Sequence, residues 1–196
     1  VELAVGEPAG TLAAHPRVLA SLHAPNLGPQ SPLAVRRQQS TALSVAAIGS
    51  DGVLWYLAPE PDGQVWRARP LARGADTRFA PVLLEERGAD TVAWVSGASG
   101  ENRLLLLHDP ARPGQRPIDL TLPAMGAAAP TGVAGAPSRL VYVDARQGLS
   151  PLLAADLGTD HVAARVARSL GMLAEPPRLA AAQVGSTTRD AYTAIG

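Results

Sequence analysis

The side chains best suited to contact a ligand lie across one predicted hairpin. Trp55 and Tyr56 belong to one apolar run, and Trp66, Arg67 and Arg69 belong to the next. An aromatic ring beside a guanidinium can hold a ligand by stacking and cation–π contact. Because side chains alternate along a strand, we expect one of Trp55 and Tyr56 in the core and the other exposed. These five residues are the candidate ligand-binding site, and the alternative is that the aromatic rings only fill the core.

Residues with catalytic potential are scattered rather than grouped. None of the four histidines has the spacing of a metal site, and His108 with Asp109 reads as the start of a turn. Ser96–Gly100 lacks the register of a nucleophile elbow. Adjacent acids occur at Glu85 and Glu86, behind a short apolar run. The sequence therefore predicts no catalytic residue, no metal site and no cofactor.

Composition excludes several classes of function. All 17 basic residues are arginines and there is no cysteine, which excludes a Walker lysine, a Schiff-base lysine, disulfides and cysteine zinc sites. The formal net charge is zero and the arginines are spread along the chain, which argues against nucleic-acid binding. No run of about 18 apolar residues is present, so we expect no membrane span.

The chain of 196 residues repeats itself. A proline that precedes an apolar run occurs at Pro32, Pro81, Pro130 and Pro177, at intervals of 49, 49 and 47 residues. A recurrence of this length is typical of stacked or circular repeat architectures.

Each interval contains up to four short apolar runs separated by turns. An Asp-Gly turn at Asp51–Gly52 is a strong hairpin signal, because glycine adopts positive φ without steric cost. The predicted strands in chain order are 2–5, 17–22, 33–35, 42–48, 53–57, 65–71, 82–84, 91–95, 103–107, 118–122, 133–134, 139–143, 152–155, 162–170, 179–182 and 191–195.

Four short strands per repeat predict an all-β fold, specifically a β-propeller whose blade is a four-stranded antiparallel sheet. The blades would span 31–79, 80–127 and 128–175, with partial blades at 1–30 and 176–196, in one domain. Another all-β fold and an α/β fold are the alternatives. Residues 160–174 also fit a helix, but the repeat register favours a strand there.

The two ends complement each other. Residues 1–30 supply a third and a fourth strand, whereas 176–196 supply a first and a second, so together they would form one composite blade. Such a blade would tie the ends together and remove free sheet edges. The chain is then a ring of four blades. Because it begins at Val1, a segment of a larger ring is the alternative.

Two bacterial groups resemble parts of this pattern. The run Ala46–Tyr56 followed by Asp62–Trp66 resembles repeats of propeller lectins, which imply carbohydrate binding. Runs such as Arg103–Leu107 and Arg139–Val143 are similar to those of envelope propellers of the TolB and LpqB type. Both resemblances imply a location outside the cytoplasm.

The leading hypothesis is a non-enzymatic propeller scaffold that binds a protein partner or a ligand in a bacterial envelope or secreted protein. A carbohydrate-binding propeller is the first alternative. The second is a hydrolase-type propeller that would use acids such as Glu85 and Glu86 near its axis.

Overall fold

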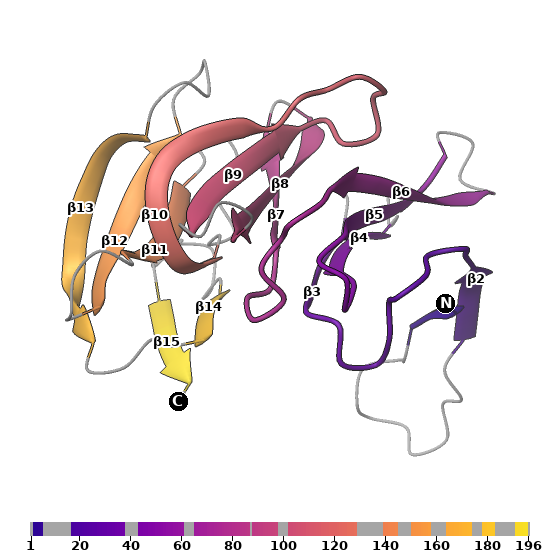
Figure 1. Ribbon diagram of the computed structural model, residues 1–196, viewed down its shortest axis with the longest axis horizontal. Helices are drawn as coiled ribbons and strands as arrows, with labels where there is room; N and C mark the ends of the chain where they lie inside the picture. Colours follow the sequence, from indigo (N-terminus) through magenta and orange to yellow (C-terminus); the bar gives the residue numbers. More distant parts are fainter. Residues whose placement is uncertain are drawn as a thin grey trace.

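The computed structural model describes the backbone of residues 2–5, 17–37, 43–60, 65–86, 88–97, 102–128, 139–144, 150–157, 164–173, 178–182 and 191–195. Side-chain environments are described within 21–36, 43–60, 65–86, 88–97 and 102–120. The regular elements of this described part are all strands (Figure 1), which confirms the all-β prediction. It contains no helix that is long and apolar enough to span a membrane.

The described strands fall where the apolar runs predicted them, to within a few residues, except that the strand predicted at 118–122 continues to Ala128. The region that also fitted a helix is a strand, Ala164–Leu173. The predicted strand at 133–134 lies outside the described residues. The strands are β1 (Glu2–Val5), β2 (Arg17–Ser21), β3 (Leu33–Arg37), β4 (Leu43–Ile48), β5 (Leu54–Pro59), β6 (Trp66–Ala72), β7 (Val82–Glu86), β8 (Ala89–Ser96), β9 (Arg103–His108), β10 (Ile118–Ala128), β11 (Arg139–Asp144), β12 (Ser150–Leu157), β13 (Ala164–Leu173), β14 (Arg178–Ala182) and β15 (Ala191–Ile195).

The first sheet is an antiparallel meander in the order β3-β4-β5-β6. Leu33 opposes Ala47 and Leu57 opposes Ala68, so cross-strand partners place small and branched apolar groups on common faces. β4 and β5 are buried on both faces, whereas β6 has two exposed residues, Arg67 and Pro70, and its other residues are half-buried. This gradient makes β4 and β5 the centre of the sheet, and β6 an edge.

The strands β7 to β13 form one seven-stranded antiparallel sheet in chain order. We call its part β7-β8-β9-β10, which repeats the meander of the first sheet, the second sheet, and its part β10-β11-β12-β13 the third sheet. The 11-residue strand β10 belongs to both. Its first half, Ile118–Pro123, pairs with β9, and Ala124–Ala128 pairs with β11 across an irregularity. The first strand of the third sheet therefore begins directly after the last strand of the second, without a connecting loop.

The two ends of the chain form separate hairpins. β1 pairs with β2, and β14 pairs with β15, each as a two-stranded sheet. Figure 1 shows the two hairpins on opposite sides of the molecule. Among the described residues, therefore, the terminal strands do not join into the expected composite blade, and no sheet closes.

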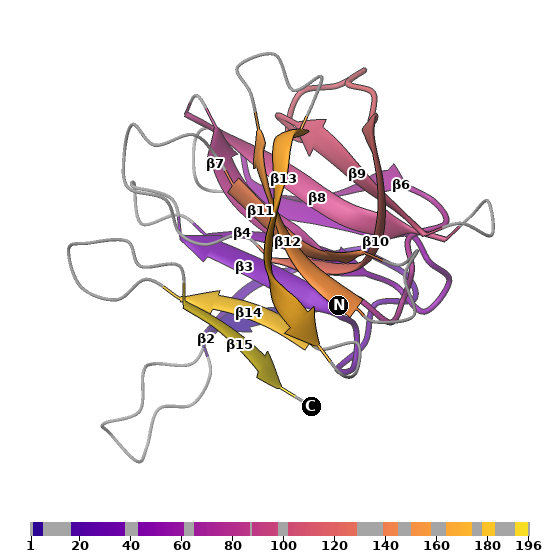
Figure 2. The same cartoon turned by 90° about the vertical axis from the view of Figure 1, so that its left-hand side faces the viewer.

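The main core lies between the first and second sheets, which stack face to face (Figure 2). β3 and β7, the first strands of the two sheets, lie against each other. Trp94 of β8 is 1% exposed and has the largest side chain of this interior. The other buried members of this core come from both sheets and from the connection between them: Ala46, Ile48, Leu54, Tyr56, Ala58, Ala75, Val92 and Leu107.

A smaller core covers the opposite face of the first sheet. Trp55 and Leu57 pack there against Ala24 and Leu27, which belong to the segment that leads from β2 to β3. The segment covers β4 and β5 and leaves Leu33 and Val35 of β3 more than half exposed.

Backbone hydrogen bonds fasten the segment before each of these two sheets to the turn between the second and third strands of that sheet. The amide of Ser50 donates to the carbonyl of Asn26 at 2.9 Å, and the amide of Gly97 donates to the carbonyl of Gly74 at 3.1 Å. The amide of Ala75 also donates to the carbonyl of Gly52 at 3.0 Å, and this bond links the two sheets. The same kind of junction therefore occurs at the same place in successive sheets.

Substitution of Gly52 tests how tightly this junction is packed. Its φ is +73°, and a Cβ added there would lie 3.0 Å from the carbonyl oxygen of Ala75. Gly88 has a similar φ of +77°, but an added Cβ would have open space. Gly88→Ala should cost about 1 kcal/mol from backbone strain, and Gly52→Ala about 1 kcal/mol more. Urea unfolding measures the free energy of unfolding of both variants. Equal losses would show that the backbone around Ala75 shifts at no cost to accept the added Cβ.

Candidate functional site

The densest group of charged side chains lies between the first two sheets, where β3 and β5 face β8. The carboxylate of Asp90 is only 2% exposed. It accepts a hydrogen bond from the hydroxyl of Tyr56 at 2.6 Å and one from Nε of Arg36 at 2.7 Å. A second guanidinium nitrogen of Arg36 contacts the same carboxylate, and the third donates to Glu85 at 2.7 Å. Arg36 thus joins two acids of the second sheet to the first sheet.

The buried position sets the ionisation of this group. Burial by itself raises the pKa of Asp90, but the neighbouring Ser44, Tyr56 and Arg36 outweigh it and hold the pKa below its ordinary value. The pKa of Tyr56 is raised, first by burial and then by its hydrogen bond to the Asp90 carboxylate. Asp90 is therefore ionised and Tyr56 is neutral at physiological pH, as the hydrogen bond between them requires.

A second polar chain continues from the first along the end of β7. The Thr91 hydroxyl donates to Glu86 at 3.0 Å and lies 3.0 Å from Nδ1 of His108. Because a hydroxyl has one proton and Thr91 gives it to the carboxylate, Nδ1 of His108 must be the donor to Thr91. In this arrangement the hydrogen of the Thr91–His108 contact is on Nδ1 of His108.

This geometry limits the chemistry that the interior can perform. Thr91 is fully buried and the Glu86 side chain is 6% exposed, so neither can reach a substrate. Glu85 contacts Arg36. Among the described residues, no three His, Asp or Glu side chains are grouped so that they could hold a metal ion. The contacts of Arg36 and Tyr56 with Asp90 and Glu85 join the first sheet to the second.

Tyr56 provides a measurable signature of this joint. Because its folded pKa is raised above the ordinary value of 10.0, the stability that it contributes is complete below that pH and is lost as the pH rises further. Tyr56→Phe should cost about 1–2 kcal/mol near neutral pH. It should also remove part of the alkaline destabilisation, measured as the fall in urea midpoint between about pH 8 and about pH 11. An unchanged fall in the variant would contradict the assignment.

The structure divides the five predicted ligand-binding residues between the two faces of the first sheet. Trp55 and Tyr56 do point to opposite faces, but both are buried, so the expectation that one would be exposed is not met. Trp55 packs in the smaller core, and Tyr56 lies between the sheets. The physical reason is that β5 is a central strand, covered on one face by the second sheet and on the other by the segment before β3.

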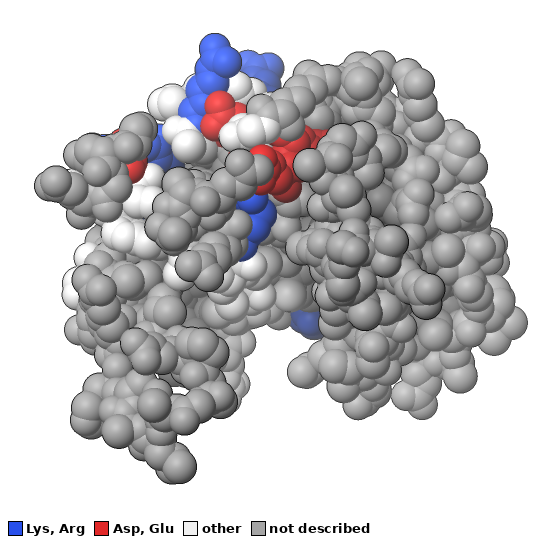
Figure 3. All heavy atoms as spheres, turned by 180° about the vertical axis from the view of Figure 1, so that it is seen from behind, with Lys and Arg blue, Asp and Glu red and all other residues white. Residues whose placement is uncertain are grey.

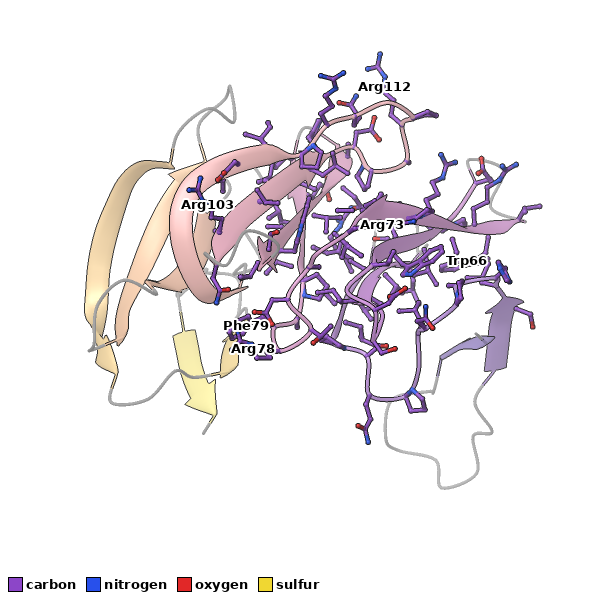
Figure 4. The ribbon with its side chains drawn as sticks, in the orientation of Figure 1. Trp66, Arg73, Arg78, Phe79, Arg103 and Arg112 are labelled. Atoms are coloured by element: carbon purple, nitrogen blue, oxygen red, sulfur yellow. The ribbon has the colours of Figure 1, made fainter. Side chains whose placement is uncertain are left out.

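Trp66, Arg67 and Arg69 lie on the edge strand β6, close to the surface. Figure 4 shows Trp66 near one end of β6, apart from the sheet-to-sheet interior. Nε of Arg67 and Nη2 of Arg69 both contact Oε1 of Glu60, at 2.7 and 2.9 Å. Nη1 of Arg69 donates to the carbonyl of Ala111 at 2.6 Å. The two arginines thus share a face and an anion, while the aromatic rings of β5 are not part of the same surface.

The contacts of Arg36 with Asp90 and of Glu60 with Arg67 were not predicted from the sequence. Arg36 and Asp90 are 54 positions apart, and their contact exists only because the two sheets stack. Arg36 lies on β3, opposite Ser44 of β4. A search for opposite charges on facing strands of successive repeats could have found its contact with Asp90. On the face drawn in Figure 3, acidic and basic side chains lie next to one another rather than in separate fields.

Comparisons with known proteins identify no relative. No protein-family model matches the chain, and neither a curated protein nor a solved structure is significantly similar to it. The resemblances to propeller lectins and to TolB and LpqB propellers therefore depend on sequence pattern alone.

Proposed function

We propose that this chain is a β-propeller domain that acts as a non-enzymatic binding scaffold. The observation that carries the proposal is that the acids between the sheets are committed to neighbouring groups: Asp90 to Arg36 and Tyr56, and Glu86 to Thr91. Asp90 and Glu86 are buried, and the partly exposed Glu85 contacts Arg36. Exposed polar groups lie instead on strand edges and loops, where a partner can bind.

Three features support the propeller part of the proposal. Successive four-stranded meanders stack face to face through an apolar core. Their first strands, β3 and β7, lie together, as they would beside a central axis. The backbone junctions at Asn26 and Gly74 recur in equivalent places. A sandwich of two sheets would have no reason to repeat the same junction.

Ring closure can be tested by disulfide trapping, because the chain has no cysteine. In a composite blade β15 would pair with β1, so Leu3→Cys combined with Thr193→Cys would form an intramolecular disulfide under mild oxidation only if the two terminal hairpins, which are separate in the structure, come together. Leu3→Cys combined with Thr77→Cys, which lies between β6 and β7, is the control and should not. Disulfide-linked dimers as the sole product would favour a segment of a larger ring.

The hydrolase alternative predicts turnover that depends on Glu85. We expect no hydrolysis of nitrophenyl esters, phosphates or glycosides by the wild-type chain above a blank without protein. Turnover that is lost in Glu85→Gln would overturn the proposal of a non-enzymatic scaffold. A glycan array tests the carbohydrate-binding alternative, whose remaining support is Trp66 at the surface. A location in the bacterial envelope or outside the cell is part of the proposal, and fractionation of bacterial cells that express the protein tests it.

A further inference from the structure

The beginning of β6 and the loop between β9 and β10 form one surface. The loop, residues 109–117, emerges from the second sheet, and Arg69 fastens it to β6 through the carbonyl of Ala111. Arg112 and Arg116 of the loop are exposed, and Arg112 projects outward at the top of Figure 4. We call residues 65–69 together with 109–117 the arginine rim.

The charges of the arginine rim do not balance. Its four arginines are Arg67, Arg69, Arg112 and Arg116, whereas Asp109 is the one acid within its residues and Glu60 is the acid that contacts two of its arginines. A single oxygen of Glu60 receives both Arg67 and Arg69. The surface therefore has an excess of guanidinium groups over carboxylates, and an anionic partner would complement it.

Arg67 and Arg69 have different roles within the rim. Arg69 uses one terminal nitrogen for Glu60 and the other for Ala111, so it holds the rim together. Arg67 contacts Glu60 through Nε, and its side chain is 63% exposed. A guanidinium held at Nε presents its two terminal nitrogens as a fork, which matches the two oxygens of a carboxylate. Glu60 thus orients Arg67 toward solvent.

The outer edge of β6 is also suited to pair with an added strand. It is the last strand of the first sheet, so among the described residues no strand pairs with its outer edge. Val65, directly before it, is half exposed, and Pro70 interrupts the row of donors later in the strand. An added strand could therefore pair along residues 65–69. Arg67 and Arg69 lie two residues apart on one face, the spacing at which alternate residues of a second strand would stand opposite them.

We propose that the arginine rim binds an extended acidic segment of a partner protein, which adds a strand to the edge of β6 and places alternating carboxylates on Arg67 and on the loop arginines. The proposal rests on the binding-scaffold function and names its partner class. Backbone pairing along β6 favours a peptide, because a polysaccharide or another polyanion has no amide groups to form a ladder.

Fluorescence anisotropy tests the proposal with a labelled eight-residue peptide of alternating Glu and Thr, at low and at physiological salt. Wild-type protein should bind it, and affinity should fall with salt. Arg67→Gln should weaken binding about tenfold, and Arg67→Lys should weaken it less, because the charge remains and the fork is lost. A peptide of alternating Gln and Thr should bind far more weakly.

Arg78→Gln is the matched control. The Arg78 side chain is 67% exposed and pairs with Asp76 on the segment between β6 and β7, so its loss changes net charge equally without touching the rim. Equal weakening by the two Gln variants, or no effect of Arg67→Gln, would overturn the proposal. If dextran sulfate binds tightly and the Glu-Thr peptide does not, the proposal of a peptide partner is overturned in favour of another polyanion. If the protein neither binds the peptide nor hydrolyses the substrates above, the proposal of peptide binding at the arginine rim is refuted, whereas the proposed scaffold function is not.

Discussion

Replacing Asp90 by Asn should destabilise the folded chain by about 3 kcal/mol, which is a large share of the stability of a typical domain. The substitution keeps the size of the side chain but removes the anion that Arg36 contacts twice and Tyr56 once. Arg36 then keeps Glu85 as its anionic partner, so the cation is not left wholly unpaired. Urea unfolding followed by tryptophan fluorescence measures the loss.

Asp119→Asn is the matched control for Asp90→Asn. Asp119 is exposed and pairs with Arg103 at 3.2 Å, and a pair of this kind contributes less than about 1 kcal/mol. The low folded pKa of Asp90 adds a second measurable effect. Its contribution is complete above its ordinary pKa of 3.8 and is lost as the pH falls below it, and Asp90→Asn should lack that part of the acid destabilisation. A loss for Asp90→Asn no larger than for Asp119→Asn would show that the polar joint adds no stability.

Replacing Trp94 by Ala should cost about 3–5 kcal/mol, the range for deleting a buried indole. Trp94 has the largest fully buried side chain among the described residues, and it lies where the first and second sheets meet. Its removal opens a cavity that alanine-rich neighbours, such as Ala46 and Ala58, cannot fill by rotating their side chains. Thermal and urea unfolding should both register the loss.

Trp66→Ala serves as the comparison, because Trp66 is half-buried on an edge strand. Its substitution should cost about 1 kcal/mol or less. Similar losses for Trp66→Ala and Trp94→Ala would mean that the interface between the sheets is not the main core of the molecule. A variant of Trp94 too unstable to purify can be replaced by Trp94→Phe, which should lie between wild type and Trp94→Ala.

The strands could be predicted because their signal is local. Alternating or continuous apolar runs end at turn residues, and the turn at Asp51–Gly52 gives β4 and β5 a defined register. The pairing of β10 with β9 along its first half and with β11 along its second half was not predictable. From sequence, residues 118–128 look like a strand followed by a loop. Only the ladder with β11 shows that Ala124–Ala128 opens the next sheet.

The candidate site was harder to predict because it depends on stacking. Aromatic residues at Trp55 and Tyr56 look alike in sequence, and their burial follows from what covers each face of β5. Arg67 and Arg69 could be found from their spacing, but Glu60 and the loop at Ala111, which give them different roles, come from another strand end and another sheet.

The shared strand β10 has a mechanical consequence. Because the one strand β10 carries hydrogen-bonded ladders to both β9 and β11, sliding the second sheet against the third would break backbone hydrogen bonds. The first sheet is attached to these two by the connection 73–81, by the backbone hydrogen bond between Ala75 and Gly52, and by side chains. Shear or twist applied to the molecule therefore concentrates at the boundary where Arg36 meets Asp90. The ion pair between Arg36 and Asp90 therefore opposes displacement of the first sheet relative to the second.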